Sequence, residues 1–138
     1  MLKGRQQGCS TFIGGRYYKK TTTQRGQTTF MLTHSQEATD NLFEMFERFH
    51  DNCNILWKAK VGKSNSKEMT FPRMASKYQV STAGSKETGR SATIINVHGS
   101  EVAFWKDGDM HLKGLFQAVP LAPGTSIVLE STANGVGN

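Results

Sequence analysis

The clearest pattern of apolar and polar positions predicts an amphipathic helix over Gln36–Asp51. Its apolar residues recur at helical spacing along one face and are Ala38, Leu42, Met45, Phe46 and Phe49. Ser35 precedes this stretch and is a typical N-cap residue, while Arg48 and His50 lie near the end, where the helix dipole favours positive charge. We expect the apolar face to pack into the protein core.

Five short runs of apolar and β-branched residues predict strands, because each lies between polar or glycine-containing segments. The expected strands are residues 28–33, 68–71, 78–82, 93–97 and 125–129. Two more helices are expected at about residues 10–20 and 111–119. Strands that alternate with helices are typical of α/β proteins, so the pattern predicts a parallel sheet flanked by helices.

The run 93–97 is a candidate buried strand that delivers a carboxylate to the edge of the sheet. It ends at a His-Gly pair, and Ser100 and Glu101 follow directly before a second apolar patch. In parallel sheets, ligands bind at the carboxyl ends of the strands, which makes Glu101 a candidate catalytic residue. A solvated glutamate at a strand end is the structural alternative. His98 and Glu101 have an HxxE spacing, but no further ligands complete a metal site.

Composition and charge restrict the class of protein. The chain of 138 residues suits one domain, and the whole excess of its net charge of +6 lies in the first 36 residues. Such a basic block suits a polyanion, either nucleotide phosphate or nucleic acid, and a solvated basic helix face is the alternative. Two distant cysteines, Cys9 and Cys53, indicate neither a disulfide framework nor a zinc site. With no membrane span or signal peptide in the sequence, we expect a soluble intracellular protein.

Residues 3–11, KGRQQGCST, match the phosphate-loop pattern GxxxxGK[ST] only in part. When Gly8 is aligned with the second glycine, Ser10 occupies the metal-binding position and Cys9 stands where the lysine belongs. Lys3 then falls on the position of the first glycine. The spacing alone therefore does not predict a working phosphate loop.

Four motifs in order resemble the ATPase domain of the large terminase subunits of tailed bacteriophages, the motors that package viral DNA. They are KGRQQGCST at 3–11, GRSAT at 89–93, HGSEVAFW at 98–105 and ESTANG at 130–135. The resemblance covers nearly the whole chain. It implies a P-loop NTPase fold of the RecA-like type, ATP and Mg²⁺ as cofactors, and ATP hydrolysis coupled to DNA movement.

The resemblance also assigns roles to residues of the loop. The implied nucleotide-binding residues are Lys3, Gly4, Arg5, Gln6, Gln7, Gly8, Cys9, Ser10 and Thr11. Many loops of this family carry the lysine at the opening of the loop, so Lys3 is implied to replace the lysine that is missing at Cys9. Arg5 corresponds to a loop arginine that the family uses, and Ser10 is implied to bind Mg²⁺.

Further roles are implied beyond the loop. Glu101 corresponds to the catalytic carboxylate, Ser100 to a weaker partner in the metal shell, and Arg90 to an arginine that reaches the γ-phosphate in a neighbouring subunit. The implied motif that couples hydrolysis to DNA movement comprises Ser131, Thr132, Ala133, Asn134 and Gly135. The structural alternatives are a solvated turn arginine at Arg90 and a helix cap or strand-end turn at 131–135.

The implied partners are double-stranded DNA, further copies in a homo-oligomeric ring, the small terminase subunit and the portal, with no membrane. The implied location is the packaging complex at the procapsid in the cytoplasm of the bacterial host. We expect residues 1–138 to form a partial terminase-type ATPase domain, incomplete at both ends, without a nuclease domain, as a fragment or prophage remnant. The alternative functions are a catalytically inactive module that binds DNA or partner proteins, and another nucleic-acid ATPase such as a helicase.

Overall fold

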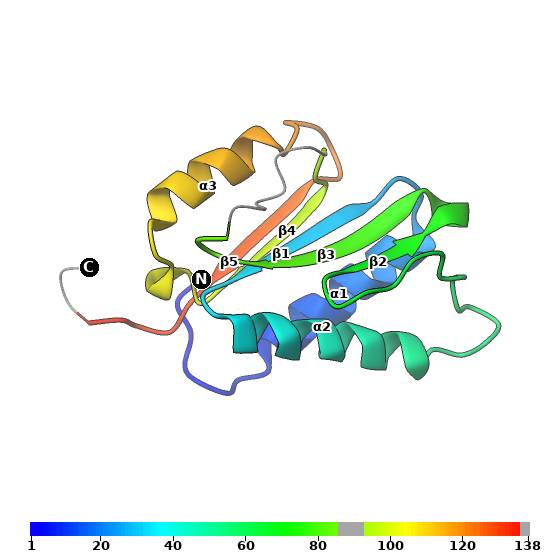
Figure 1. Ribbon diagram of the computed structural model, residues 1–138, viewed down its shortest axis with the longest axis horizontal. Coiled ribbons are helices and arrows are strands. Elements are labelled where there is room, and N and C mark those ends of the chain that lie inside the picture. The colour runs from blue at the N-terminus through cyan, green and yellow to red at the C-terminus, as the bar shows by residue number, and fades with distance from the viewer. Residues whose placement is uncertain (86–92, 136–138) are drawn as a thin grey trace.

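A five-stranded sheet lies between helices in the computed structural model, which describes residues 1–85 and 93–135 (Figure 1). The helices are α1 Cys9–Thr23, α2 Gln36–Asp51 and α3 Gly108–Gln117, with short 3₁₀ helices η1 Pro72–Met74 and η2 Val102–Phe104. The strands are β1 Thr28–Thr33, β2 Glu68–Phe71, β3 Ser76–Thr82, β4 Asn96–Ser100 and β5 Ser126–Glu130. All the predicted elements are present. No helix in the described part of the chain is both long and apolar enough to cross a bilayer.

The strand order is β2-β3-β1-β4-β5, and the four strands from β3 to β5 are parallel. This confirms an α/β sheet with parallel strands. The prediction is wrong for β2, which runs antiparallel to β3. Only η1 and Ala75 separate these two strands, and so short a connection turns the chain straight back, whereas a parallel neighbour needs a longer crossover.

Strand β4 begins and ends three residues later than expected, so the His-Gly pair lies inside the strand. The polar His98 fits there because its side chain is fully buried and meets Glu130 on the neighbouring strand. Gly99 fits because a Cβ atom at that position would come within 2.7 Å of Leu129 Cδ2 and 2.9 Å of the Trp105 ring. A tight approach between β4, β5 and Trp105 therefore requires glycine at this position.

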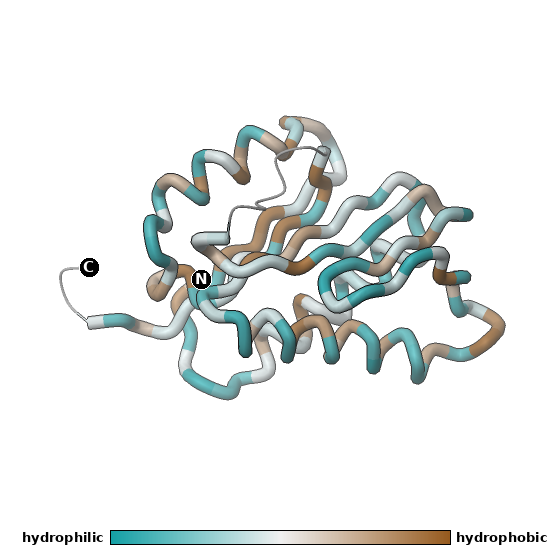
Figure 2. The backbone as a smooth tube through the Cα atoms, in the orientation of Figure 1, coloured by the Kyte–Doolittle hydropathy of each residue, from teal (hydrophilic) through white to brown (hydrophobic). Residues whose placement is uncertain are grey.

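The sheet buries a hydrophobic cluster on each face. Along β1, Met31 joins the cluster formed with α1 and α2, while Phe30 and Leu32 join the cluster formed with α3. Figure 2 shows apolar segments of the strands lying between the two helical layers. Ser35 caps α2 as predicted, because its side chain accepts a hydrogen bond from the backbone N–H of Ala38 at 3.2 Å.

The amino-terminal residues 1–3 lie beside the carboxyl end of β5. Leu2 forms a parallel bridge with Ser131, and the backbone N–H of Lys3 donates to the Ser131 carbonyl at 2.9 Å. The terminal ammonium of Met1 donates to the Leu129 carbonyl at 2.7 Å. This pairing fixes the backbone of Lys3 at the edge of the sheet where β4 and β5 both end.

A substitution at Phe46 tests how much the α2 side of the core contributes to stability. Phe46 is 1% exposed, and its ring stacks on that of Tyr78 with centroids 3.6 Å apart. We expect Phe46→Ala to lower the free energy of unfolding by about 3–5 kcal/mol because it leaves a cavity. Urea unfolding followed by circular dichroism measures the change. Phe116→Ala on α3, where the side chain is 43% exposed, is the matched control and should cost less than about 1 kcal/mol. Equal losses in the two variants would contradict this assignment of the core.

Candidate functional site

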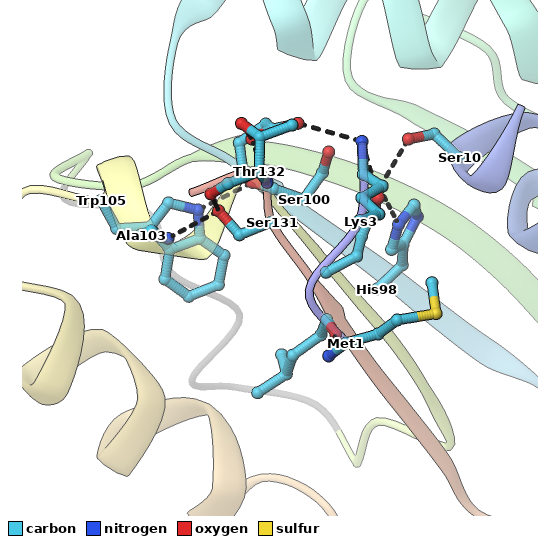
Figure 3. Close-up of polar contacts among 12 residues, drawn as sticks. Met1, Lys3, Ser10, His98, Ser100, Ala103, Trp105, Ser131 and Thr132 are labelled. Atoms are coloured by element: carbon cyan, nitrogen blue, oxygen red, sulfur yellow. Dashed lines mark hydrogen bonds and ion pairs between the residues drawn. The ribbon is translucent and has the colours of Figure 1, made fainter. Parts of the chain in front are cut away.

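A single lysine bridges two carboxylates at the carboxyl edge of the sheet (Figure 3). Lys3 Nζ lies 3.1 Å from Glu101 Oε1 and 3.1 Å from Glu130 Oε2. Burial acts to lower the pKa of Lys3, but its contacts with the two carboxylates outweigh that effect and raise the pKa above its usual value. The lysine is therefore held as an ammonium ion between Glu101 and Glu130.

Glu130, the last residue of β5, is fully buried at the centre of this cluster. Its Oε1 accepts a hydrogen bond from Ser10 Oγ at 2.5 Å and lies 3.0 Å from His98 Nε2. Burial alone would raise the pKa of Glu130, but contacts with His98, Ser10 and Lys3 together lower it to about 2. Glu130 is therefore an ionised carboxylate in the interior.

Glu101 follows β4 directly and has left-handed backbone geometry, with φ of 54°. Its Oε2 accepts hydrogen bonds from the backbone N–H of Thr132 at 3.0 Å and from the Thr132 hydroxyl at 2.8 Å. Burial acts to raise the pKa of Glu101, and the contacts with Thr132 and Lys3 outweigh it and lower the pKa. Holding a non-glycine residue in this backbone conformation costs about 1–3 kcal/mol, and residues strained in this way are common at functional sites.

The candidate coupling residues lie against the 3₁₀ turn η2 that follows Glu101. Ser131 Oγ accepts from the backbone N–H of Ala103 at 3.2 Å, and Asn134 Nδ2 donates to the Ala103 carbonyl at 2.8 Å. Thr132 reaches Glu101 itself, whereas Ala133 and Gly135 are exposed. The predicted coupling segment is therefore attached to both Glu101 and the turn behind it.

The candidate phosphate loop leads from Lys3 into the first turn of α1. Residues 4–8 are exposed, and Gln6 and Gly8 have left-handed backbone geometry, with φ of 55° and 70°. No side chain caps α1, and its first turn holds no acidic residue. The N–H groups of an uncapped helix start attract anions, so the loop and helix together suit a phosphate.

A cleft of about 350 Å³ opens beside this cluster. Its lining residues are Lys3, Arg5, Gln6, His34, Glu101, Phe104 and Thr132. The rings of His34 and Phe104 have centroids 6.0 Å apart. His34 follows β1, and it reaches the cleft because β1 lies directly beside β4 in the sheet. Neither ring was predicted as a site residue.

The structure brings together Lys3, Ser10, Glu101, Ser131 and Thr132, all of which were predicted from the sequence. Gly4, Arg5, Gln6, Gln7, Gly8, Cys9 and Thr11 lie in or next to the same loop. Ser100 is buried, and its carbonyl accepts a hydrogen bond from Trp105 Nε1 at 2.9 Å. Arg90 lies outside the described residues, so its predicted position near a γ-phosphate stays a prediction.

Sequence reasoning missed Glu130 and His98 as members of the site. The acid that directly precedes Ser131 at the end of a strand was the available signal for Glu130. His98 belongs to no group of three or more His, Cys, Asp or Glu side chains placed to hold a metal ion within residues 1–85 and 93–135. Its role in the described structure is to contact Glu130.

The low pKa of Glu130 predicts a loss of stability in acid. A carboxylate whose pKa falls on folding stabilises the protein above its unfolded pKa, and this contribution disappears as the pH falls through the folded pKa. The free energy of unfolding should therefore fall by a few kcal/mol between about pH 4.5 and pH 2. Urea unfolding across this window should show a shallower fall for Glu130→Gln. Glu44→Gln, which removes an exposed carboxylate on α2, should keep the parent slope, and an unchanged slope in Glu130→Gln would contradict the prediction.

No protein-family model matches the sequence, and no curated protein sequence matches it significantly. Solved structures do match the fold. The large terminase of bacteriophage HK97 matches with a TM-score of 0.77 and 14% identity, over 95% of this chain and 28% of the terminase chain. The ATPase domain of the Thermus phage P74-26 large terminase matches with a TM-score of 0.73 and 14% identity, over 99% of this chain and 59% of that one.

A third similar structure is the large terminase of a thermophilic bacteriophage in complex with ADP. It matches with a TM-score of 0.61 and 11% identity, over 96% of this chain and 32% of the terminase chain. The chain thus spans less than two thirds of the length of each of these three structures. The comparisons confirm the fold that the sequence resemblance implies: the described residues have the α/β fold of the ATPase domain of phage large terminases.

Proposed function

We propose that this chain is the ATP-hydrolysing core of a viral DNA-packaging motor of the large-terminase type. The observation that carries the proposal is the convergence of Lys3, Glu101 and Thr132 at one cleft, with Ser10 hydrogen-bonded to Glu130 behind Lys3. These residues come from three separate segments of the sequence, which are residues 3–11, the residue after β4 and the residues after β5. The similarity in fold to terminase ATPase domains supports the same function.

The loop and the start of α1 would hold the phosphates of ATP. Backbone N–H groups of the uncapped helix would bind phosphate oxygens, and Lys3 would pair with the β- and γ-phosphates. Lys3 already lies 12% exposed at the cleft, where its ammonium can exchange a carboxylate for a phosphate. The ADP bound to one terminase of similar fold supports nucleotide binding by this chain.

The oxygen atoms of this cluster fit a magnesium ion. Mg²⁺ prefers hard oxygen ligands and is usually bound by one or two protein groups together with water and substrate phosphates. The Ser10 hydroxyl is the residue that would hold it, and Ser100 is the weaker candidate that the sequence resemblance implies. Bound Mg²⁺ would neutralise negative charge on the phosphates.

Glu101 would orient and activate the attacking water. Two hydrogen bonds from Thr132 hold one carboxylate oxygen, and Lys3 holds the other. When Lys3 pairs with phosphate, the Thr132 hydrogen bonds keep Glu101 in place and its other oxygen becomes available for water. Residues 131–135 would then sense the state of Glu101 and couple hydrolysis to movement.

The proposed partners are double-stranded DNA, further copies of the chain in a ring, the small terminase subunit and the portal. Arg90 would act in the ring by reaching the γ-phosphate in a neighbouring subunit, where an arginine can raise the rate about 10³–10⁵-fold. The nucleotide and the cleft belong to one subunit, and the arginine belongs to the next.

Glu101→Gln separates turnover from binding. We expect ATP hydrolysis to fall about a hundredfold or more, since the amide keeps the shape of the side chain but is not a base. Affinity for a fluorescent ATP analogue in Mg²⁺ should barely change, because the loop holds the phosphates. Steady-state phosphate release and equilibrium titration of the same preparation measure the two effects.

Two loop variants are the controls for this experiment. Lys3→Ala should weaken binding of the analogue itself, whereas Cys9→Ala should be mild because Lys3 supplies the charge. If the unmutated chain shows no saturable, magnesium-dependent binding, the proposed activity is wrong and an inactive binding module is favoured. Should affinity fall in step with turnover in Glu101→Gln, the residue belongs to the metal or nucleotide site and not to the water.

Mixed subunits test Arg90. If this arginine acts on a neighbouring subunit, a mixture of Arg90→Ala and Glu101→Gln subunits should recover part of the lost hydrolysis. The recovery is expected because some interfaces then combine an intact Glu101 with an intact Arg90. Phosphate release measured across mixing ratios gives the answer, and activity that never exceeds the sum of the separate mutants would show that Arg90 does not act in trans.

A further inference from the structure

We infer that Glu130 is the carboxylate that positions the Ser10 hydroxyl for a divalent cation, a role that nucleotide hydrolases usually give to an acid on the neighbouring strand. The inference rests on the proposed function, since it concerns the metal that accompanies ATP. In P-loop hydrolases an Asp at the end of the Walker B strand works with the loop Ser or Thr at Mg²⁺. In this chain the corresponding strand is β4.

The register of the sheet places a different carboxylate beside the position that usually holds the acid. Strand β4 ends in Ser100, and a serine hydroxyl has no charge with which to balance a divalent cation. Ser100 pairs with Glu130 in the parallel register of β4 and β5. The carboxylate thus lies at the same level of the sheet, one strand farther along.

The hydrogen bond between Glu130 and Ser10 suits the proposed role. Ser10 Oγ and Glu130 Oε1 are 2.5 Å apart, and an ionised carboxylate can only accept, so the hydroxyl donates its proton to Glu130. A hydroxyl in this orientation keeps the lone pairs of its oxygen available to a cation. Carboxylates that orient metal ligands in this way commonly determine metal affinity.

The neighbours of Glu130 hold its carboxylate in one orientation. His98 Nε2 lies 3.0 Å from Oε1 on the side of β4, and Lys3 Nζ lies 3.1 Å from Oε2. Within the described part of the chain, Oε2 has no well-aligned hydrogen bond in addition to this ion pair. Glu130 therefore depends on Lys3 for the neutralisation of its charge.

The balance of charge explains why a cation is needed when nucleotide binds. Glu101 and Glu130 carry two negative charges, and Lys3 is the ammonium ion that pairs with both. When Lys3 pairs with phosphate, the fully buried Glu130 keeps its contacts with Ser10 and His98 but loses the ammonium ion at Oε2, and a buried charge that loses its ion-pair partner is strongly destabilising. A divalent cation at the Ser10 hydroxyl replaces the missing positive charge.

Metal-dependent nucleotide binding tests this role without relying on turnover. The affinity of a fluorescent ADP analogue is measured with Mg²⁺ and with EDTA, and the ratio of the two affinities reports the contribution of the metal. We expect Glu130→Gln to lower this ratio about 10–100-fold, with a smaller change in the affinity measured in EDTA. Ser10→Ala should lower the ratio similarly. The ratio of the double variant should be no lower than that of Ser10→Ala alone, because the two substitutions break the same interaction.

Two further variants complete the experiment. Glu130→Asp keeps the charge but withdraws it from Ser10, so it must also lower the ratio, and it covers the case in which Glu130→Gln does not fold. Glu68→Gln on β2, the opposite edge strand from β5, is the matched control and should keep the parent ratio.

Several outcomes would overturn the inference. They are an unchanged ratio in both Glu130 variants, additive losses in the double variant, and an equal loss of affinity with and without Mg²⁺, which would mean that Glu130 acts through Lys3 alone. If the unmutated chain binds nucleotide and its ratio is insensitive to Glu130, only this inference fails. If the unmutated chain binds no nucleotide, the proposed function fails with it.

Discussion

The buried negative charge of Glu130 is the constraint on which the arrangement of the site depends. Its side chain is fully buried, so its ionisation has to be offset by the groups around it. Those groups are Lys3 from the amino-terminal segment, Ser10 from the start of α1 and His98 from β4. The loop of residues 3–10 and strand β4, which are distant in the sequence, are held at the end of β5 because they share one carboxylate. A change in any of them leaves part of that charge without a partner.

The sheet determines where this cluster forms. Because β1, β4 and β5 are neighbouring parallel strands, their carboxyl ends lie at one edge, and the residues that follow them meet there. Glu101 follows β4, while Glu130 closes β5 and Thr132 lies just beyond it. Residues 1–3 pair with the end of β5, which brings the lysine to the same level without any strand between it and the carboxylates.

Much of the fold could be predicted from the sequence, because the apolar periodicity of α2 and the β-branched runs are local signals. The direction of β2 was not predicted correctly, since it depends on how η1 turns the chain. The limits of β4 were also displaced, because His98 looked like a break in an apolar run. A buried histidine can continue a strand only if a partner such as Glu130 is present, and that partner is 32 residues away.

As with the fold, some site residues could be predicted from local sequence motifs, whereas others depend on contacts between distant parts of the chain. Lys3, Ser10 and Glu101 were found through motif resemblance, in which order along the chain is sufficient. Glu130 opens the ESTANG motif, but the resemblance assigned it no role, and the register of β5 beside β4 is what places its carboxylate beside Ser100. His34 and Phe104 required the strand order as well, since they follow β1 and β4, which are neighbours in the sheet but distant in the sequence.

The contacts of Lys3 and Thr132 suggest how nucleotide and movement are connected in the proposed motor. Glu101 is held by Lys3 on one oxygen and by Thr132 on the other, so its environment would change if Lys3 paired with phosphate as proposed. Only the hydrogen bonds from Thr132 to Glu101 would then remain. Thr132 belongs to the segment that is hydrogen-bonded to η2 through Ala103. Because a ligand shifts a conformational equilibrium only through contacts that differ between two states, the exchange of partners at Lys3 is the differential contact that this site offers. In the proposed motor, a signal from nucleotide to residues 131–135 needs no long pathway, because the carboxylate that we propose to act on water is bonded directly to Thr132.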